Sequence, residues 1–308
     1  MMRNKTEKKP LMSGLKYWIR LISMGLVGGI FLAFIVIEMI FIMAITQPAP
    51  SIIGSPPHNN NGIEYQSVAL LSELEGITLS GWYIPSENGA AIILLHGYGS
   101  NRLGMISRAD ILARHGYGVL LYDLRGHGES GGKKRSFGWQ DVKDVKAALE
   151  FLSRTENVNP DRIGILGFSI GGQIAIRATA EYKEIKAIIA DDPSFVTIDD
   201  APRSLNIKEK TTYLTSWITS RCVSLWTGIH IPAGIPEKIK EISPRPIMLI
   251  VTGESRGRDL VRYFYQIAYQ PKELWEIPET FHGGQLKARP LEYEDKMITF
   301  FNKNLLMK

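Results

Sequence analysis

Short apolar runs alternate with segments of helical periodicity through most of the chain. The continuous apolar runs at residues 91–95 and 118–122 are typical of strands that are covered on both faces of a parallel sheet. Residues 141–154 place apolar side chains three and four positions apart, which predicts an amphipathic helix. Further strands are expected at 67–72, 77–84, 163–166, 185–190, 247–251 and 273–277, and further helices at 102–115, 170–180, 260–268 and 291–305. This order predicts a mostly parallel sheet with helices on both faces, which binds ligands beyond the carboxyl ends of its strands.

One much longer apolar run, residues 21–46, precedes this alternation and contains a single charged residue, Glu38. As a helix it would extend about 39 Å, enough to cross a hydrocarbon core of about 30 Å. The run is longer than the apolar region of a cleaved signal peptide, and no clear cleavage site follows it. We therefore expect an uncleaved transmembrane helix. We expect Glu38 to lie near the outer membrane interface; the alternative is that it is protonated or paired with another helix.

The net charge of +5 belongs to the segment before this helix. Residues 1–20 contain six basic side chains and one acidic one, which leaves 30 basic and 30 acidic side chains in the rest of the chain. Basic residues ahead of a span favour a cytoplasmic N-terminus, so the domain that follows should lie on the extracytoplasmic side. A charge-balanced domain argues against a nucleic-acid-binding surface.

Composition divides the chain after the expected span. Residues 47–62 are rich in Pro and Asn, which predicts a linker ahead of a domain at 63–308. Residues 193–243 interrupt the alternation of strands and helices and are a candidate lid. A single cysteine, Cys222, excludes an internal disulfide, and no nucleotide-binding or metal-binding motif is present, so neither a cofactor nor a metal is expected.

A candidate nucleophile lies between the strand expected at 163–166 and the helix that follows it. Residues 167–171 read Gly-Phe-Ser-Ile-Gly, a G-x-S-x-G pattern in which glycines relieve the crowding of a tight turn and leave Ser169 accessible. The helix that begins at Ile170 points unpaired N–H groups at the same place. The backbone N–H groups of Ile170 and of Tyr98, at the end of strand 91–95, are therefore expected to form an oxyanion hole.

With these features the chain resembles the α/β-hydrolase superfamily over about residues 66–306. The resemblance rests on His96-Gly97 after one strand, Asp-Leu-Arg-Gly-His-Gly-Glu-Ser at 123–130 after the next, the turn at Ser169 and a late histidine, His282. It implies an α/β-hydrolase fold with a small lid insertion, in the esterase, lipase and serine-peptidase-like branch. In that branch residues 123–130 are usually a structural turn, so we assign neither Asp123 nor His127 to catalysis.

His282 is the expected general base, because it follows the last strand and precedes the final helix, where the superfamily has its histidine. The other five histidines lie in the linker, in turns, at a helix end and in the irregular region.

The acid of the triad departs from the superfamily pattern. That pattern implies an aspartate three residues beyond Gly253, where this chain has Arg256. We favour Glu254, with Asp191 and Asp259 as the alternatives, because the acid has only to orient and stabilise an imidazolium.

The sequence thus predicts a membrane-anchored serine hydrolase, carboxylesterase-like or lipase-like, with a peptidase-like enzyme as a further option. It would cleave a small-molecule ester, thioester or amide through Ser169, His282 and Glu254 and an acyl-enzyme. A membrane-tethered α/β-hydrolase-fold protein that binds without catalysis is the alternative, and the irregular acid position keeps it open.

The orientation predicted from the charge asymmetry can be tested by topology mapping in a bacterial membrane. A C-terminal alkaline phosphatase fusion should be active and a C-terminal green fluorescent protein fusion dark, because the six basic residues of 1–20 retain the N-terminus in the cytoplasm. Replacing those six residues by Gln should produce mixed orientations. A fluorescent C-terminal fusion on the unmodified chain would contradict the predicted orientation.

Overall fold

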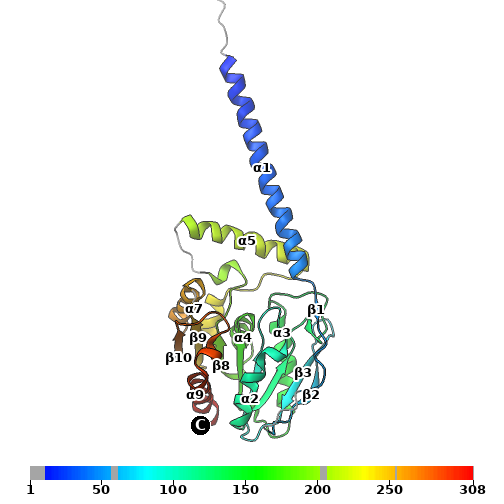
Figure 1. Cartoon of the computed structure of the whole chain (residues 1–308), viewed down its shortest axis with the longest axis vertical. Helices are drawn as coiled ribbons and strands as arrows, with labels where there is room; N and C mark the ends of the chain where they lie inside the picture. The colour runs from blue at the N-terminus through cyan, green and yellow to red at the C-terminus, as the bar shows by residue number, and fades with distance from the viewer. Residues whose placement is uncertain (1–10, 57–61, 202–206, 254, 308) are drawn as a thin grey trace, which may run out of the picture.

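An eight-stranded sheet forms the centre of the domain, and a long helix projects from it (Figure 1). The computed structural model describes residues 11–56, 62–201, 207–253 and 255–307. The strands are β2 (Gln66–Leu71), β3 (Thr78–Ile84), β4 (Ala91–Leu95), β5 (Gly118–Tyr122), β7 (Ile163–Phe168), β8 (Ile185–Asp191), β9 (Ile247–Thr252) and β10 (Lys272–Ile277). Their order across the sheet is β10-β9-β8-β7-β4-β5-β3-β2. All neighbours are parallel except β2 with β3 and β3 with β5, so the expected mostly parallel sheet is confirmed.

Helices cover both faces of this sheet, as the alternating pattern predicts. One buried cluster joins the sheet to α3 (Asp141–Ser153), α4 (Ile170–Glu181) and α7 (Ser255–Ile267). The opposite cluster joins it to α2 (Ile106–Arg114) and α9 (Pro290–Phe301). The short elements are β1 (Ala49–Pro50), η1 (Arg102–Met105), β6 (His127–Gly128), η2 (Pro160–Arg162), η3 (Ile198–Asp200), α6 (Ile235–Lys238), η4 (Ile239–Ile242), α8 (Gln285–Ala288) and η5 (Asn302–Leu306).

Helix α1 (Leu11–Ile45) begins ten residues earlier than the expected span. No proline lies between Leu11 and Leu21, and extending an existing helix is far easier than nucleating one. Its segment Gly14–Ile45 is long and apolar enough to cross a membrane, and little of it is buried. Near its C-terminal end, however, Ile42 is fully buried against the domain.

The longest element of the candidate lid is helix α5 (Ile207–Thr227), which lies across the domain beside the end of α1 (Figure 1). Ile218, Cys222 and Val223 pack with Ile42 in one apolar cluster. The Thr219 hydroxyl donates a hydrogen bond to the Glu38 carboxylate. Of the two expectations for Glu38, the structure therefore supports pairing with another helix.

The first half of the expected linker lies against the domain. Residues Ala49 and Pro50 form β1, which pairs with β6 as a two-stranded parallel ribbon. The N–H groups of Ile53 and Gly54 donate to the carboxylate of Glu129. Residues 57–61 lie outside the described part of the chain.

Candidate active site

Ser169 stands in a sharp turn between β7 and α4, at the carboxyl edge of the sheet. Its backbone has a φ of 55° and a ψ of −116°, a conformation that non-glycine residues rarely adopt. The turn is held because the Ser169 N–H donates to the Asp191 carbonyl over 2.9 Å. Gly167 has no room for a side chain, since a Cβ there would lie 2.0 Å from the Gly171 oxygen. The half-buried Ser169 side chain is therefore presented at the edge where ligands of such sheets bind.

The two N–H groups that we expect to form an oxyanion hole flank this serine. Ile170 is the first residue of α4, where backbone N–H groups have no partner within the helix. A Cβ on Gly97 would lie 3.5 Å from the Ser169 Cβ, so the Gly97–Tyr98 peptide is adjacent to the serine.

His96 sets the direction of that peptide. Its Nε2 accepts a hydrogen bond from the Leu124 N–H at 2.9 Å, so Nδ1 carries the proton and donates to the Gly97 carbonyl at 2.8 Å. The carbonyl of Gly97 and the N–H of Tyr98 belong to one trans peptide and point in opposite directions. By binding the carbonyl, His96 directs the Tyr98 N–H away from itself. Burial lowers the pKa of His96 to about 3, which keeps this arrangement at neutral pH.

His282 lies in the loop between β10 and α8, on the same edge of the sheet. Its ring packs on Phe168, the residue before Ser169, with 4.9 Å between ring centroids. Its Nδ1 lies 3.4 Å from Oδ2 of Asp192, and its side chain is 40% exposed. The structure thus brings His282 to the residue beside the expected nucleophile and to a buried carboxylate.

The carboxylate beside His282 belongs to Asp192, which the sequence interpretation did not include among its acid candidates. It follows β8, is nearly fully buried and has a φ of 47°. Thr252, at the end of the neighbouring β9, donates its N–H to Oδ1 at 3.0 Å and its hydroxyl to Oδ2 at 2.7 Å. These bonds hold the carboxylate at the carboxyl edge, facing His282. The sequence signal for it is the pair of consecutive aspartates, Asp191 and Asp192, at the end of the strand.

Asp191 is bound in a different environment. Its Oδ2 accepts hydrogen bonds from Arg108 at 2.7 Å and from the Tyr293 hydroxyl at 2.6 Å, and its Oδ1 accepts one from Gln285. Burial raises the pKa of Tyr293, which therefore remains a donor. The Asp191 carboxylate ties α2, α8 and α9 to the sheet, and its interactions are with these three side chains rather than with His282.

The other two acid candidates are Asp259 and Glu254. Asp259 is exposed on α7. Glu254 lies outside the described residues.

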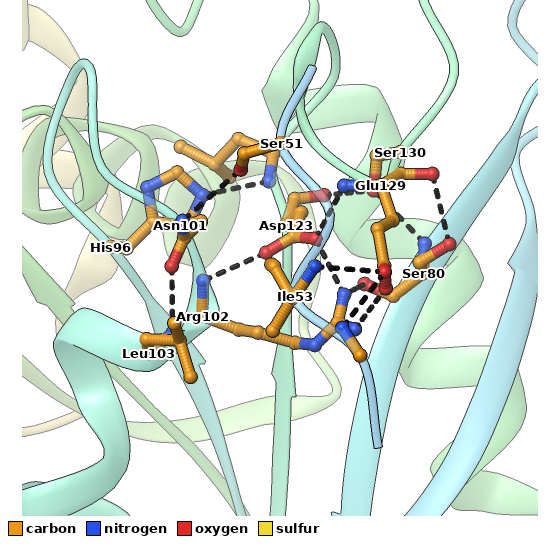
Figure 2. A network of polar contacts seen from close by, with 12 residues as sticks. Ser51, Ile53, Ser80, His96, Asn101, Arg102, Leu103, Asp123, Glu129 and Ser130 are labelled. Atoms are coloured by element: carbon orange, nitrogen blue, oxygen red, sulfur yellow. Dashed lines mark hydrogen bonds and ion pairs between the residues drawn. The ribbon is translucent and has the colours of Figure 1, made fainter. Parts of the chain in front are cut away.

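Residues 123–130 form the structural turn that the resemblance implies (Figure 2). The fully buried Asp123 accepts hydrogen bonds from the Arg102 N–H at 2.7 Å, the Arg102 guanidinium at 2.5 Å and the Glu129 N–H at 2.9 Å. The hydrogen bond from Arg102 holds the pKa of Glu129 below its usual value. Asp123 therefore stabilises the turn, and Figure 2 shows Ser51 and Ile53 on the same network.

No group of His, Cys, Asp or Glu side chains that could hold a metal ion occurs among the described residues. A hollow of about 360 Å³ lies between α5 and the loop before α6, bordered by Asp199, Trp217, Arg221 and His230 among others. Neither Ser169 nor His282 borders it, so it is separate from the site described above.

The family model described as Serine aminopeptidase, S33, matches residues 86–257, more than half of the chain. The Escherichia coli O157:H7 protein YfhR is 26% identical, over 82% of this chain and 84% of its own length. Among solved structures, the Pyrococcus furiosus esterase Pf2001 is similar with 26% identity and a TM-score of 0.68, over 84% of this chain and 98% of its own. A dienelactone hydrolase from Anabaena variabilis shares the fold at 18% identity, with a TM-score of 0.55 over 79% of this chain and 99% of its own. The expected α/β-hydrolase fold is confirmed, and an esterase is among its structural relatives.

Three buried groups around this site should make stability depend on pH. Burial lowers the pKa of His96 to about 3 and that of His127 to about 4, so both bind protons more weakly than in the unfolded chain, where the pKa is about 6.5. Their contribution to the free energy of unfolding is present above pH 6.5 and is lost as the pH falls. Burial raises the pKa of Asp141 to about 6, so below pH 6 this residue opposes one of the two histidines.

We therefore expect the free energy of unfolding to fall by about 1 kcal/mol per pH unit between pH 6 and 5, the net effect of one histidine. The measurement is the melting temperature of the detergent-solubilised protein at pH 7, 6 and 5. The variant His127→Asn should be almost independent of pH over the same interval. An equal pH dependence in His127→Asn and in the unmodified protein would contradict the assignment.

Proposed function

Because the chain belongs to the serine aminopeptidase (S33) family of α/β-hydrolases, we propose that it is a membrane-anchored serine hydrolase that acts through Ser169, His282 and Asp192. The observation that carries the proposal is the buried Asp192 carboxylate, which two hydrogen bonds from Thr252 hold against His282. The ring of His282 rests on the residue next to Ser169. A nucleophile, a base and an orienting acid on one sheet edge are what acyl transfer requires.

The proposed reaction has two steps. His282 accepts the proton of the Ser169 hydroxyl as its oxygen attacks the substrate carbonyl, and the resulting oxyanion accepts hydrogen bonds from the N–H groups of Tyr98 and Ile170. His282 then protonates the leaving alcohol, thiol or amine, and Ser169 retains the acyl group. In the second step His282 deprotonates a water molecule, whose oxygen attacks the acyl carbon. The bond to the Ser169 oxygen then breaks, the acid leaves, and His282 returns its proton to Ser169. Asp192 holds the imidazole in the required tautomer and stabilises its protonated form throughout.

Asp192 replaces Glu254 in this proposal for a physical reason. The donors that fix Asp192 are the N–H and hydroxyl of Thr252, which ends the strand after which the superfamily pattern implies the acid. The neighbouring strand β8 thus supplies the carboxylate, and β9 supplies the groups that orient it. The alternative of a non-catalytic binding protein depended on the lack of a suitably placed acid. Asp192 beside His282 argues against that alternative.

A carboxylic ester is the substrate class that we favour. The Pyrococcus furiosus esterase is similar over nearly its whole length. The thiohydrolase AneE of Aspergillus aculeatus is 31% identical over 44% of this chain, which keeps thioesters open. The family description keeps amides open as well.

The proposal includes α1 as a retained anchor. A cleaved signal peptide leaves a mature domain that folds without it, whereas Ile42 of α1 is fully buried and shares a cluster with Trp139 and Val223. Glu38 of α1 is bonded to α5. These contacts support a helix that stays with the domain.

A fluorophosphonate probe tests the nucleophile. The full-length protein in detergent should be labelled on Ser169, and Ser169→Ala should abolish labelling, because the probe reacts only with an activated serine. Ser153→Ala, on the exposed end of α3, is the matched control and should be labelled normally. On p-nitrophenyl esters and aminoacyl-nitroanilides, we expect turnover of the esters. Labelling that persists in Ser169→Ala, or none in the folded protein, would refute the proposed function.

The acid can be assigned with three isosteric substitutions. Asp192→Asn should lower kcat by about 10⁴-fold, because the amide no longer fixes the tautomer that the triad histidine requires. Glu254→Gln and Asp259→Asn should leave kcat within about twofold. A large loss in Glu254→Gln together with an active Asp192→Asn would instead restore Glu254 as the acid.

A further inference from the structure

The last residue of α1 contacts the residue that we expect to supply an oxyanion-hole N–H. The hydroxyl of Tyr98 donates a hydrogen bond to the carbonyl of Ile45. The last carbonyls of a helix have no partner within the helix, so this bond caps α1. Tyr98 thus has its backbone beside Ser169 and its side chain on the end of α1.

The ring of Tyr98 is held on several sides. Phe137 stacks on it, with 4.9 Å between centroids and planes 5° apart, and His127 meets it edge-on at 5.5 Å. The Arg135 guanidinium lies 4.8 Å from the ring centroid. Arg135 also bonds the chain that leaves α1, donating its N–H to the Thr46 carbonyl at 2.8 Å and its Nε to the Gln47 carbonyl at 2.6 Å. The Tyr98 side chain is therefore held between the domain and the end of α1.

The chain beyond Gln47 continues this attachment. The N–H groups of Ala49 and Ser51 donate to the carbonyls of Gly126 and Gly128, each at 2.9 Å. The next residues bind Glu129, which also accepts a hydrogen bond from Arg102 (Figure 2). The segment is therefore docked along residues 126–129, which places the end of α1 in a defined position relative to Tyr98.

These contacts act on the same peptide as His96. The His96 ring holds the Gly97 carbonyl from one side, and the Tyr98 side chain is anchored on the other. An oxyanion hole stabilises the transition state only when its donors are already in place, because donors that must reorganise lose their advantage.

We propose that the end of α1 is a positioning element of the oxyanion hole: the Ile45 carbonyl, through the Tyr98 hydroxyl, fixes the Tyr98 N–H. The inference rests on the proposed function and adds that full activity requires α1 in its docked position. Tyr98 acts in two ways, through its N–H on the substrate and through its hydroxyl on the anchor.

The test compares two tyrosine-to-phenylalanine variants of the full-length protein in lipid nanodiscs. Tyr98→Phe removes the bond to Ile45 and leaves the ring and the N–H. Tyr117→Phe is the matched control, because the hydroxyl of Tyr117 also donates a hydrogen bond, to Asn302 at 2.8 Å, but at the amino end of β5 and away from the site. Both variants lose one partly buried hydroxyl bond, so a general loss of stability would affect both.

Tyr98→Phe should lower kcat on p-nitrophenyl acetate at least tenfold with little change in KM. The loss should stay below the 10² to 10³ expected on removing an oxyanion-hole donor outright. The second-order rate of fluorophosphonate labelling of Ser169 should fall by a similar factor. In that reaction the serine oxygen bonds to phosphorus and fluoride leaves, while the phosphoryl oxygen occupies the oxyanion hole. Tyr117→Phe should match the unmodified protein in both measurements.

Arg135→Gln provides a second, independent variant, since it releases the Gln47 carbonyl and the face of the Tyr98 ring. It should also lower kcat. The double variant with Tyr98→Phe should lose less than the product of the two single losses, because both substitutions weaken the same attachment of Tyr98 to the end of α1. If Tyr98→Phe does not fold, the kcat of Arg135→Gln decides the test: a lowered kcat supports the inference, and an unchanged kcat overturns it.

Normal Ser169 labelling and unchanged kcat in Tyr98→Phe, or equal losses in Tyr98→Phe and Tyr117→Phe, would overturn the inference and leave the proposed function intact. Absence of labelling in the unmodified protein would instead refute the proposed function.

Discussion

The first turn of α4 packs so closely against the ends of β4 and β7 that backbone meets backbone. A Cβ on Gly171 would lie 2.3 Å from the Leu95 carbonyl oxygen, so the contact excludes any side chain. This close approach forces Ser169 into its strained conformation, at a cost of about 1–3 kcal/mol that the buried apolar face of α4 offsets. It also sets Ser169 beside the Gly97–Tyr98 peptide. The geometry of the proposed nucleophile and oxyanion hole thus derives from one steric constraint.

Two consecutive carboxylates at the end of β8 have different partners. Asp191, still in the strand, points into the layer of α2, α8 and α9, where three donors bind it. Asp192, one residue later, has left the strand with a positive φ and faces Thr252 and His282. Because the chain turns at Asp192, the two adjacent carboxylates lie in different environments. One carboxylate secures the fold beneath the site, and the other is available to the histidine.

The parts of this structure that the sequence predicts are those with a local cause. Continuous apolar runs mark β4 and β5 at their observed bounds, because strands covered on both faces need apolar residues at every position. The turn at Ser169 is predictable because its glycines are required sterically within five residues. The position proposed for Asp192 is not predictable from the sequence, because it depends on Thr252 of the neighbouring strand as hydrogen-bond donor and on Arg108 binding Asp191. Glu254 lies one residue beyond Gly253 rather than three, so the sequence pattern carried no information about which carboxylate the fold would orient.

The docking of residues 49–54 is also not predictable from the sequence, because it too depends on non-local contacts. Most of its bonds run from backbone N–H groups to the backbone of Gly126 and Gly128 or to Glu129, and backbone groups bond in the same way whatever side chains accompany them. A composition rich in Pro and Asn was therefore read as a linker, although its first half is attached. The attachment bears on whether α1 is an anchor or a leader. Removing α1 would expose the apolar surface around Trp139 and Val223, forgo about 2 kcal/mol from the burial of Ile42 alone, and leave the Tyr98 hydroxyl without its acceptor. A domain in which α1 completes both an apolar cluster and the support of the proposed oxyanion hole is better suited to keeping that helix than to losing it.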